Sequence, residues 1–148
     1  MRRLVQTAIP IAVQPTEPRT KDLSSIHILV VDDNPDSLDI AAFGLELANA
    51  TVSVATSGAE ALEQLDRAVP DVLISDIGMP EMDGYDLMRQ VRRRSPEKGG
   101  NVWAIALTAY ATDATIDKTI EAGFQCYLAK PIEPNELVAI ICKLFYQN

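Results

Sequence analysis

The chain has 148 residues, a formal net charge of −8 and an apolar fraction of 47%. This length suits one domain with a hydrophobic core, and the composition is ordinary for a soluble globular protein. The negative charge argues against non-specific binding to nucleic acid, which relies on cations that neutralise phosphates. No apolar run approaches the roughly 20 residues of a membrane-spanning helix. Neither nucleic acid nor a membrane is therefore expected as a direct partner.

The first 24 residues differ in composition from the rest of the chain. Three prolines recur there among polar and charged residues: Pro10, Pro15 and Pro18. This pattern favours an extended linker or N-terminal tail. Residues 25–148 form the expected folded domain.

The chain has two cysteines, Cys126 and Cys142, and they lack the spacing of metal ligands. We expect two buried, reduced thiols in a cytoplasmic protein. The apolar part of the N-terminus is short and interrupted by polar residues and Pro10, which is not typical of a cleaved signal peptide.

Strand-like and helix-like patterns alternate from residue 26 onward. Strands are predicted at residues 26–31, 51–55, 71–75, 102–107 and 124–128, where the sequence is mostly apolar and rich in β-branched residues. The intervening segments show helical spacing, with helices predicted from residue 35, over 58–68, around 87–91, over 113–122 and from residue 134. Five strands alternating with five helices imply a parallel sheet with right-handed crossovers, which is a doubly wound α/β domain.

Residues at the predicted helix ends support this order. Asn34 is a good N-cap, and Pro35 suits the first helical position. Ser57 and Glu60 have the spacing of a capping box. Gly123 is expected to be a left-handed C-cap.

Polar residues follow four of the five predicted strands. Asp32 and Asp33 follow the first, Asp76 the third, Thr108 the fourth, and Lys130 lies just past the fifth. Because ligands bind at the carboxyl ends of parallel strands, we expect these side chains to meet in one cleft.

Carboxylates within about 4–5 Å of one another would repel by several kcal/mol at an effective dielectric constant near 20. Such a cluster needs a bound cation or raised pKa values. Mg²⁺ held by carboxylates, a backbone carbonyl and water fits this requirement. A metal-neutralised aspartate is also a competent nucleophile towards a phosphoryl group.

Four segments carry a resemblance to a known family. They are Leu29–Asn34, Asp76–Gly84, Leu107–Ala109 and Tyr127–Pro131. In this order and spacing they resemble the receiver domain of two-component response regulators, over about residues 26–146. The resemblance implies a flavodoxin-like sheet of five parallel strands in the order 2-1-3-4-5, with five helices on both faces.

The resemblance assigns roles to the acidic residues. Asp76 would be the phosphoacceptor, taking a phosphoryl group from a partner's phosphohistidine. Asp33 would ligate Mg²⁺ together with Asp76 and the backbone carbonyl of Gly78, and Asp32 would act largely through a metal-bound water. Gly78 often corresponds to a longer polar residue in relatives, so the lifetime of the phosphorylated state is not predicted.

The resemblance also implies a switch. Lys130 would pair with the phosphoryl oxygens, and Thr108 would donate a hydrogen bond to them. Tyr127 matches the family's switch aromatic and would turn inward. The face formed by the helix over 113–122, the strand over 124–128 and the helix from 134 would then change shape, because phosphorylation adds charge at Asp76.

The implied partner is a sensor histidine kinase or a histidine phosphotransfer domain, and a homodimer through the switching face is a further expectation. Residues Val5–Ile11 resemble the last strand of a histidine-kinase ATPase domain, which would fit the C-terminal part of a hybrid sensor kinase. A stand-alone regulator is the other alternative. No output segment follows the last helix in this sequence, so we expect the signal to leave through a protein surface or another part of a larger polypeptide.

Enzymatic and flavin-binding functions on this fold are not favoured by the sequence. The domain is not expected to be an enzyme beyond catalysing phosphorylation and dephosphorylation of its own aspartate. A Mg²⁺-dependent phosphatase would need a second acid at Gly78, and the acids after the first strand would repel a flavin phosphate. A degenerate receiver that binds proteins without being phosphorylated remains the alternative.

Three further features have simpler interpretations. His27 is expected to be a packed or rim residue, and the run Arg92–Arg94 a solvated helix end that complements the helix dipole. The last helix has a core stripe of Leu137, Ile140, Ile141 and Leu144. It also has a second apolar stripe of Val138, Cys142 and Phe145, for which a wide core face and a partner surface are equally supported.

Overall fold

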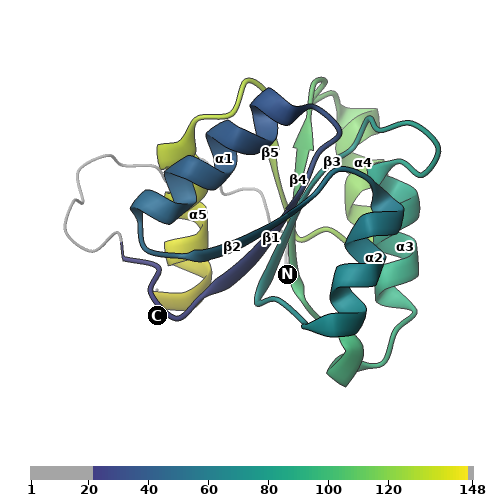
Figure 1. Cartoon of the computed structure of the whole chain (residues 1–148). Helices are drawn as coiled ribbons and strands as arrows, with labels where there is room; N and C mark the ends of the chain where they lie inside the picture. The colour runs from purple at the N-terminus through teal and green to yellow at the C-terminus, as the bar shows by residue number, and fades with distance from the viewer. Residues whose placement is uncertain (1–21, 147–148) are drawn as a thin grey trace.

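The computed structural model describes residues 22–146, and in this part of the chain strands and helices alternate (Figure 1). The strands are β1 (His27–Val31), β2 (Thr51–Ala55), β3 (Val72–Asp76), β4 (Trp103–Thr108) and β5 (Cys126–Ala129). The helices are α1 (Pro35–Leu47), α2 (Gly58–Arg67), α3 (Gly84–Arg92), the short 3₁₀ helix η1 (Pro96–Lys98), α4 (Asp113–Ala122) and α5 (Pro134–Tyr146).

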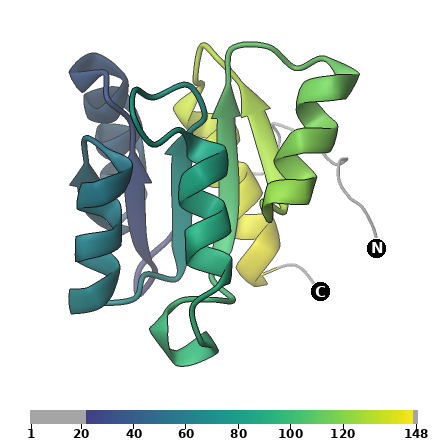
Figure 2. The same ribbon diagram turned by 90° about the vertical axis from the view of Figure 1, so that its right-hand side faces the viewer.

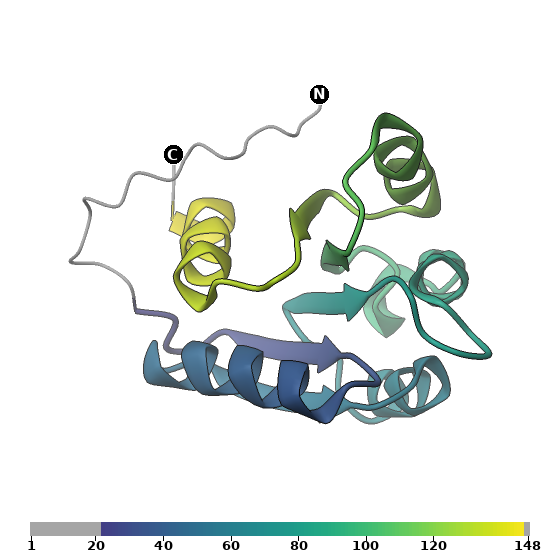
Figure 3. The same ribbon diagram turned by 90° about the horizontal axis from the view of Figure 1, so that it is seen from above.

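The five strands form one parallel sheet in the order β2-β1-β3-β4-β5. Helices α1 and α5 cover one face, and α2, α3 and α4 cover the other (Figures 1 and 3). The predicted doubly wound fold and strand order are therefore confirmed. No helix in the described part of the chain is long and apolar enough to cross a bilayer.

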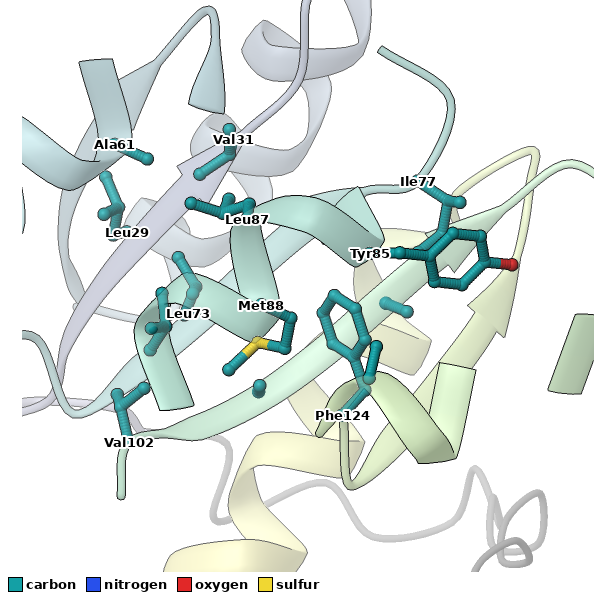
Figure 4. Close-up of a cluster of buried hydrophobic side chains, with 14 of the residues drawn as sticks. Leu29, Val31, Ala61, Leu73, Ile77, Tyr85, Leu87, Met88, Val102 and Phe124 are labelled. Carbon is teal, nitrogen blue, oxygen red and sulfur yellow. The ribbon is translucent and has the colours of Figure 1, made fainter. Parts of the chain in front are cut away.

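Each face of the sheet has its own hydrophobic core. In β1, Leu29 and Val31 pack towards α2 and α3, whereas Ile28 and Val30 pack towards α1 and α5. This division follows from the alternation of side chains along a strand. Figure 4 shows the first core, in which Leu87 and Met88 of α3 lie over the strands. Burial on both faces explains why β1, β3 and β4 read as nearly continuous apolar runs.

The helix ends follow the predicted chemistry with one correction. The Asn34 side chain accepts a hydrogen bond from the Ser37 amide, and Pro35 occupies the first turn. Ser57 caps α2, but the carboxylate of Glu60 accepts from the amide of Thr56 instead of from Ser57. The predicted reciprocal capping box is therefore only half formed, because the carboxylate reaches one residue further back.

A reciprocal capping box does occur at α3. The side chain of Asp83 accepts from the amide of Asp86, and the Asp86 side chain accepts from the amide of Asp83. An acid at both positions takes the place of the more familiar Ser/Thr and Glu pair.

The packed domain includes a residue of the predicted tail. Leu23 is fully buried in the core of α1 and α5, and its amide donates to the carbonyl of Ala48. Leu23 thus packs with the folded domain, two residues before the predicted start of the domain at residue 25. Residues 1–21 of the predicted linker, including Val5–Ile11, lie outside the described residues.

The second apolar stripe of α5 extends the core. Val138 is buried, and Cys142 and Phe145 are half-buried against the same cluster. This favours the wide core face over a partner surface. The thiols are half-buried instead of fully buried, and burial raises the pKa of the Cys126 thiol to about 11.

The prediction of a solvated helix end was wrong for Arg92. Its guanidinium is partly buried and donates hydrogen bonds to backbone carbonyls of other segments. Arg93 is exposed, as expected, and Arg94 pairs with Asp66. His27 is half-buried and hydrogen-bonded to the Ser53 hydroxyl, which fits the predicted packed or rim residue.

Candidate functional site

Three carboxylates meet where β1 and β3 end. Asp32 and Asp33 directly follow β1, and Asp76 is the last residue of β3. One oxygen from each carboxylate lies within 4.8 Å of the other two. The strands are hydrogen-bonded neighbours with their carboxyl ends at the same edge of the sheet (Figure 2), so the two segments are brought together by the topology.

A lysine that follows the outer strand β5 completes this cluster. Lys130 follows β5, and its ammonium lies 3.2 Å from Asp32 Oδ2 and 3.2 Å from Asp76 Oδ1. The Lys130 amide donates to the carbonyl of Thr108, which holds the start of this loop against the end of β4. The structure thus brings together Asp32, Asp33, Asp76 and Lys130, as the sequence predicted.

Burial and neighbouring charges shift the pKa values of Asp76 and Lys130. Asp32 and Asp76 are buried, whereas Asp33 is exposed. Burial and the negative charge of Asp32 raise the pKa of Asp76, although Lys130 opposes this shift. Burial alone would lower the pKa of Lys130, but its hydrogen bond to Asp76 and the charges of Asp76 and Asp32 raise it overall.

The acidic cluster has an oxygen available for a cation. Asp32 Oδ1 accepts a hydrogen bond from the Asn34 amide. Asp32 Oδ2 is buried and has the ion pair with Lys130 but no hydrogen bond within the described residues. Three carboxylates against one ammonium leave an excess of negative charge, and buried oxygens of this kind are the ligands that a hard divalent cation prefers.

Thr108 and Tyr127, the two predicted switch residues, lie in different environments. Thr108 ends β4 and is buried, and its hydroxyl donates to the carbonyl of Tyr110 and accepts from the amide of Tyr110, both at 3.1 Å. Tyr127 in β5 is half-buried and packs against the core beneath α3 and α4. The Tyr110 side chain itself is 74% exposed.

The two glycines after Asp76 differ in how closely they are packed. The Ile77 carbonyl accepts from the amides of Met79 and Gly84, which folds the loop back on itself. A Cβ at Gly84 would lie 2.5 Å from the backbone oxygen of Asp76, so only glycine fits there. A Cβ at Gly78 would contact nothing within 4 Å, so this exposed position accepts a side chain.

Sequence reasoning missed the role of Gly84. Its position at the first residue of α3 is not a signal in itself, because many residues begin a helix. The requirement comes from the close approach of the helix start to the Asp76 carbonyl, and this approach is a tertiary contact.

Comparison with known proteins identifies the family. The family model "Response regulator receiver domain" matches residues 28–142. The chain belongs to this family. It is a receiver domain, and receiver domains are signalling modules of two-component or phosphorelay systems.

Individual relatives agree with this assignment. The "Uncharacterized 14.6 kDa protein in sodA1 3'region" of Leptolyngbya boryana is 45% identical over 119 residues, covering 80% of this chain and 89% of that protein. The response regulator SaeR of Staphylococcus aureus is 34% identical over 118 residues, covering 80% of this chain. The match spans only 50% of SaeR, so the activity of that whole protein does not transfer directly.

A solved structure supplies a relevant comparison. It is the receiver domain of the sensor histidine kinase PA1611 from Pseudomonas aeruginosa, with a magnesium ion coordinated in its active-site cleft. The two chains are 32% identical with a TM-score of 0.72, covering 80% of this chain and 95% of that one.

Proposed function

We propose that Asp76 is the phosphoacceptor of this receiver domain. The observation that supports this most strongly is the position of its carboxylate, buried at the end of β3 and 3.2 Å from the Lys130 ammonium. One oxygen of Asp76 attacks the phosphorus of a phosphohistidine on the partner. The new O–P bond forms as the P–N bond breaks, and the imidazole leaves with the bonding electrons.

Asp33, Asp76 and the carbonyl of Gly78 are the proposed ligands of Mg²⁺, with Asp32 acting through a bound water. The close carboxylate oxygens and the buried Asp32 oxygen without a hydrogen bond fit a hard divalent cation. When bound, Mg²⁺ neutralises charge on the phosphoryl oxygens. The magnesium ion in the PA1611 receiver is consistent with this proposal.

Lys130 and Thr108 are the proposed contacts to the transferred group. Lys130 already pairs with Asp76, so its ammonium is close enough to pair with the negatively charged oxygens of a phosphoryl group on Asp76. The Thr108 hydroxyl now donates to the Tyr110 carbonyl. A phosphoryl oxygen on Asp76 is a stronger, charged acceptor, so we expect the hydroxyl to exchange partners. Tyr127 would then turn towards the space behind Thr108.

The proposed donor is a sensor histidine kinase or a histidine phosphotransfer domain. Because such kinases draw the phosphoryl group from ATP, we also propose a cytoplasmic location. The domain context has two alternatives: part of a hybrid sensor kinase, in line with the PA1611 receiver being part of a sensor histidine kinase, or a stand-alone regulator. We further propose the α4–β5–α5 face as the surface that changes on phosphorylation and allows homodimerisation.

Intact mass spectrometry tests the central proposal. The full chain is incubated with acetyl phosphate in the presence of MgCl₂ or EDTA, next to Asp76→Asn. We expect one phosphoryl adduct that requires Mg²⁺ and disappears in the variant. If the folded wild-type chain gives no adduct, the domain is a degenerate receiver and the chemistry proposed for Asp76 is wrong. A matched Asp39→Asn variant, which removes an exposed acid of α1, should be phosphorylated normally.

A further inference from the structure

Arg92 joins three separate segments at the edge of the sheet where β4 and β5 begin. Its Nε and Nη2 donate to the carbonyl of Gly123 at 3.0 and 2.8 Å. Nη2 also donates to the side-chain oxygen of Gln125 at 3.1 Å, and Nη1 donates to the carbonyl of Gly100 at 2.9 Å. One side chain at the end of α3 therefore fixes the exit of α4, the entry to β5 and the loop before β4.

The acceptors of this guanidinium are all neutral oxygens. Gly123 is the C-cap of α4, so its carbonyl lies at the negative end of the helix dipole. The dipole of α4 thus compensates part of the charge of a partly buried cation. The side-chain oxygen of Gln125 also accepts from the amide of Ala104 at 2.7 Å, which extends the network into β4.

The fit between Arg92 and Gly123 is close. A Cβ at Gly123 would lie 2.7 Å from Arg92 Cγ, and the residue has a φ of 116°, which favours glycine. The arginine stem therefore packs directly on the backbone at the end of α4. This end of the helix is held by both packing and hydrogen bonds.

The two ends of α4 are held very differently. Its buried side chains, Thr119 and Ala122, belong to its C-terminal half, and the buried Phe124 follows immediately. Near its N-terminus, Asp113 and Ala114 are exposed, as is the loop over residues 109–112. The helix is thus attached to the domain mainly through its C-terminal half.

The exposed end of α4 is the one connected to the acidic cluster. The loop before the helix is tied to Thr108 through the two hydrogen bonds with Tyr110. If the Thr108 hydroxyl exchanges the Tyr110 carbonyl for a phosphoryl oxygen, the change reaches α4 through its N-terminus.

We propose that Arg92 is a positioning residue that fixes the C-terminal end of α4, so that the phosphorylation-dependent movement is confined to the N-terminal half of α4 and the preceding loop. The inference rests on the function proposed for Asp76. Arg92 acts as the pivot about which α4 moves, and it contacts neither the phosphoryl group nor its ligands.

Amide chemical shifts measure where the domain responds. The full chain, labelled with ¹⁵N, is compared with and without Mg²⁺ and beryllofluoride, an analogue of the phosphoryl group. In the wild type we expect large shift changes over residues 108–116 and small ones over residues 123–126. In Arg92→Met, which keeps an apolar stem but deletes the donors, we expect large changes to extend to residues 123–126. Arg92→Lys should restore part of the confinement, because its ammonium can still reach the Gly123 carbonyl.

Arg93→Met is the matched control, since it removes an exposed arginine from the next position. It should respond like the wild type. If Arg92→Met does not fold, Gln125→Met deletes one arm of the network and should extend the response to Ala104 and Cys126. Large wild-type changes over residues 123–126, or an Arg92→Met response equal to that of the wild type, would overturn the proposal. In either case the response at Asp76 would still support the receiver chemistry. If the wild type shows no response at Asp76, both the Arg92 proposal and the function proposed for Asp76 are wrong.

Discussion

Replacing Asp76 with asparagine is expected to stabilise the domain when Mg²⁺ is absent. The carboxylate oxygens of Asp32 and Asp76 lie within 4.8 Å of each other, so at an effective dielectric constant near 20 their charges repel by at least about 3 kcal/mol. The attraction of Lys130 at 3.2 Å has a similar size, about 5 kcal/mol by the same formula, and is smaller in practice because its side chain is partly exposed. These terms largely cancel, and the raised pKa of Asp76 shows that burial and repulsion prevail.

The net gain in Asp76→Asn is therefore on the order of 1 kcal/mol, which corresponds to an increase in Tm of about 3–5 °C for a domain of this size. Its pH dependence has a definite sign. Because the folded pKa of Asp76 lies above the unfolded value, folding is penalised as pH rises through these two values, and the penalty is complete above the folded pKa. Below the ordinary Asp pKa of about 3.9, the difference between wild type and variant should disappear.

Thermal unfolding followed by circular dichroism, in EDTA and in MgCl₂, measures both effects. In EDTA the variant should unfold at the higher temperature. In MgCl₂ the wild type should gain stability through metal binding, and the variant, which lacks one ligand, should gain less. Asp39→Asn controls for the general loss of one negative charge. A lower Tm for Asp76→Asn than for wild type in EDTA would mean that the ion pair with Lys130 outweighs the repulsion, and the electrostatic reasoning would fail.

Three further predictions concern other contacts, and the first has a matched control variant. Gly84→Ala should lower the free energy of unfolding by about 1–3 kcal/mol, since its methyl would meet the Asp76 carbonyl, whereas Gly78→Ala should leave urea denaturation nearly unchanged. Lys130→Met should destabilise the metal-free domain at neutral pH, since it leaves two buried carboxylates unpaired, and urea titrations below pH 4 should show a smaller loss. Leu23→Ala should cost about 2–5 kcal/mol because the side chain is fully buried; a negligible change would restore the boundary after residue 24.

The acidic cluster could be predicted from sequence because it depends on topology. Parallel strands place their carboxyl ends at one edge, so residues that follow β1, β3 and β5 must meet there whatever the details of packing. Asp32, Asp33, Asp76 and Lys130 needed only correct strand assignment. The central strands β1, β3 and β4 were assigned easily because burial on both faces leaves apolar runs of a length typical of strands.

Arg92 shows where this reasoning stops. Its place in the run Arg92–Arg94 suggested a solvated helix end, and nothing in the identity of the two following arginines distinguishes Arg92 from them. One signal was present: Arg92 lies four residues after the buried Met88, at the margin of the apolar face of α3. Its main acceptors, however, are the carbonyls of Gly100 and Gly123. Because every residue has a backbone carbonyl, the sequence does not indicate which carbonyls accept these hydrogen bonds.

Leu23 illustrates a second limit. Prolines and charges before it indicated a linker, and composition averaged over a segment cannot resolve a single buried side chain at its end. The hydrogen bond from Leu23 to the carbonyl of Ala48 brings the residue against the end of α1, which is a contact between distant parts of the sequence. Domain boundaries read from composition are therefore least accurate where a terminal residue packs on the core.

The two ends of the parallel strands differ in their electrostatics. At the carboxyl edge, Asp76 is held in a cluster whose negative charges repel, so that a cation or a phosphoryl group changes the balance of forces there. At the other edge, the guanidinium of Arg92 is surrounded by neutral acceptors and holds the end of α4 without competing charges. In the proposed switch, a helix that is fixed at one end and connected to the acidic cluster at the other would convert a local change at Thr108 into a rotation. A switch of this kind requires both the electrostatic tension at Asp76 and the firm attachment at Arg92.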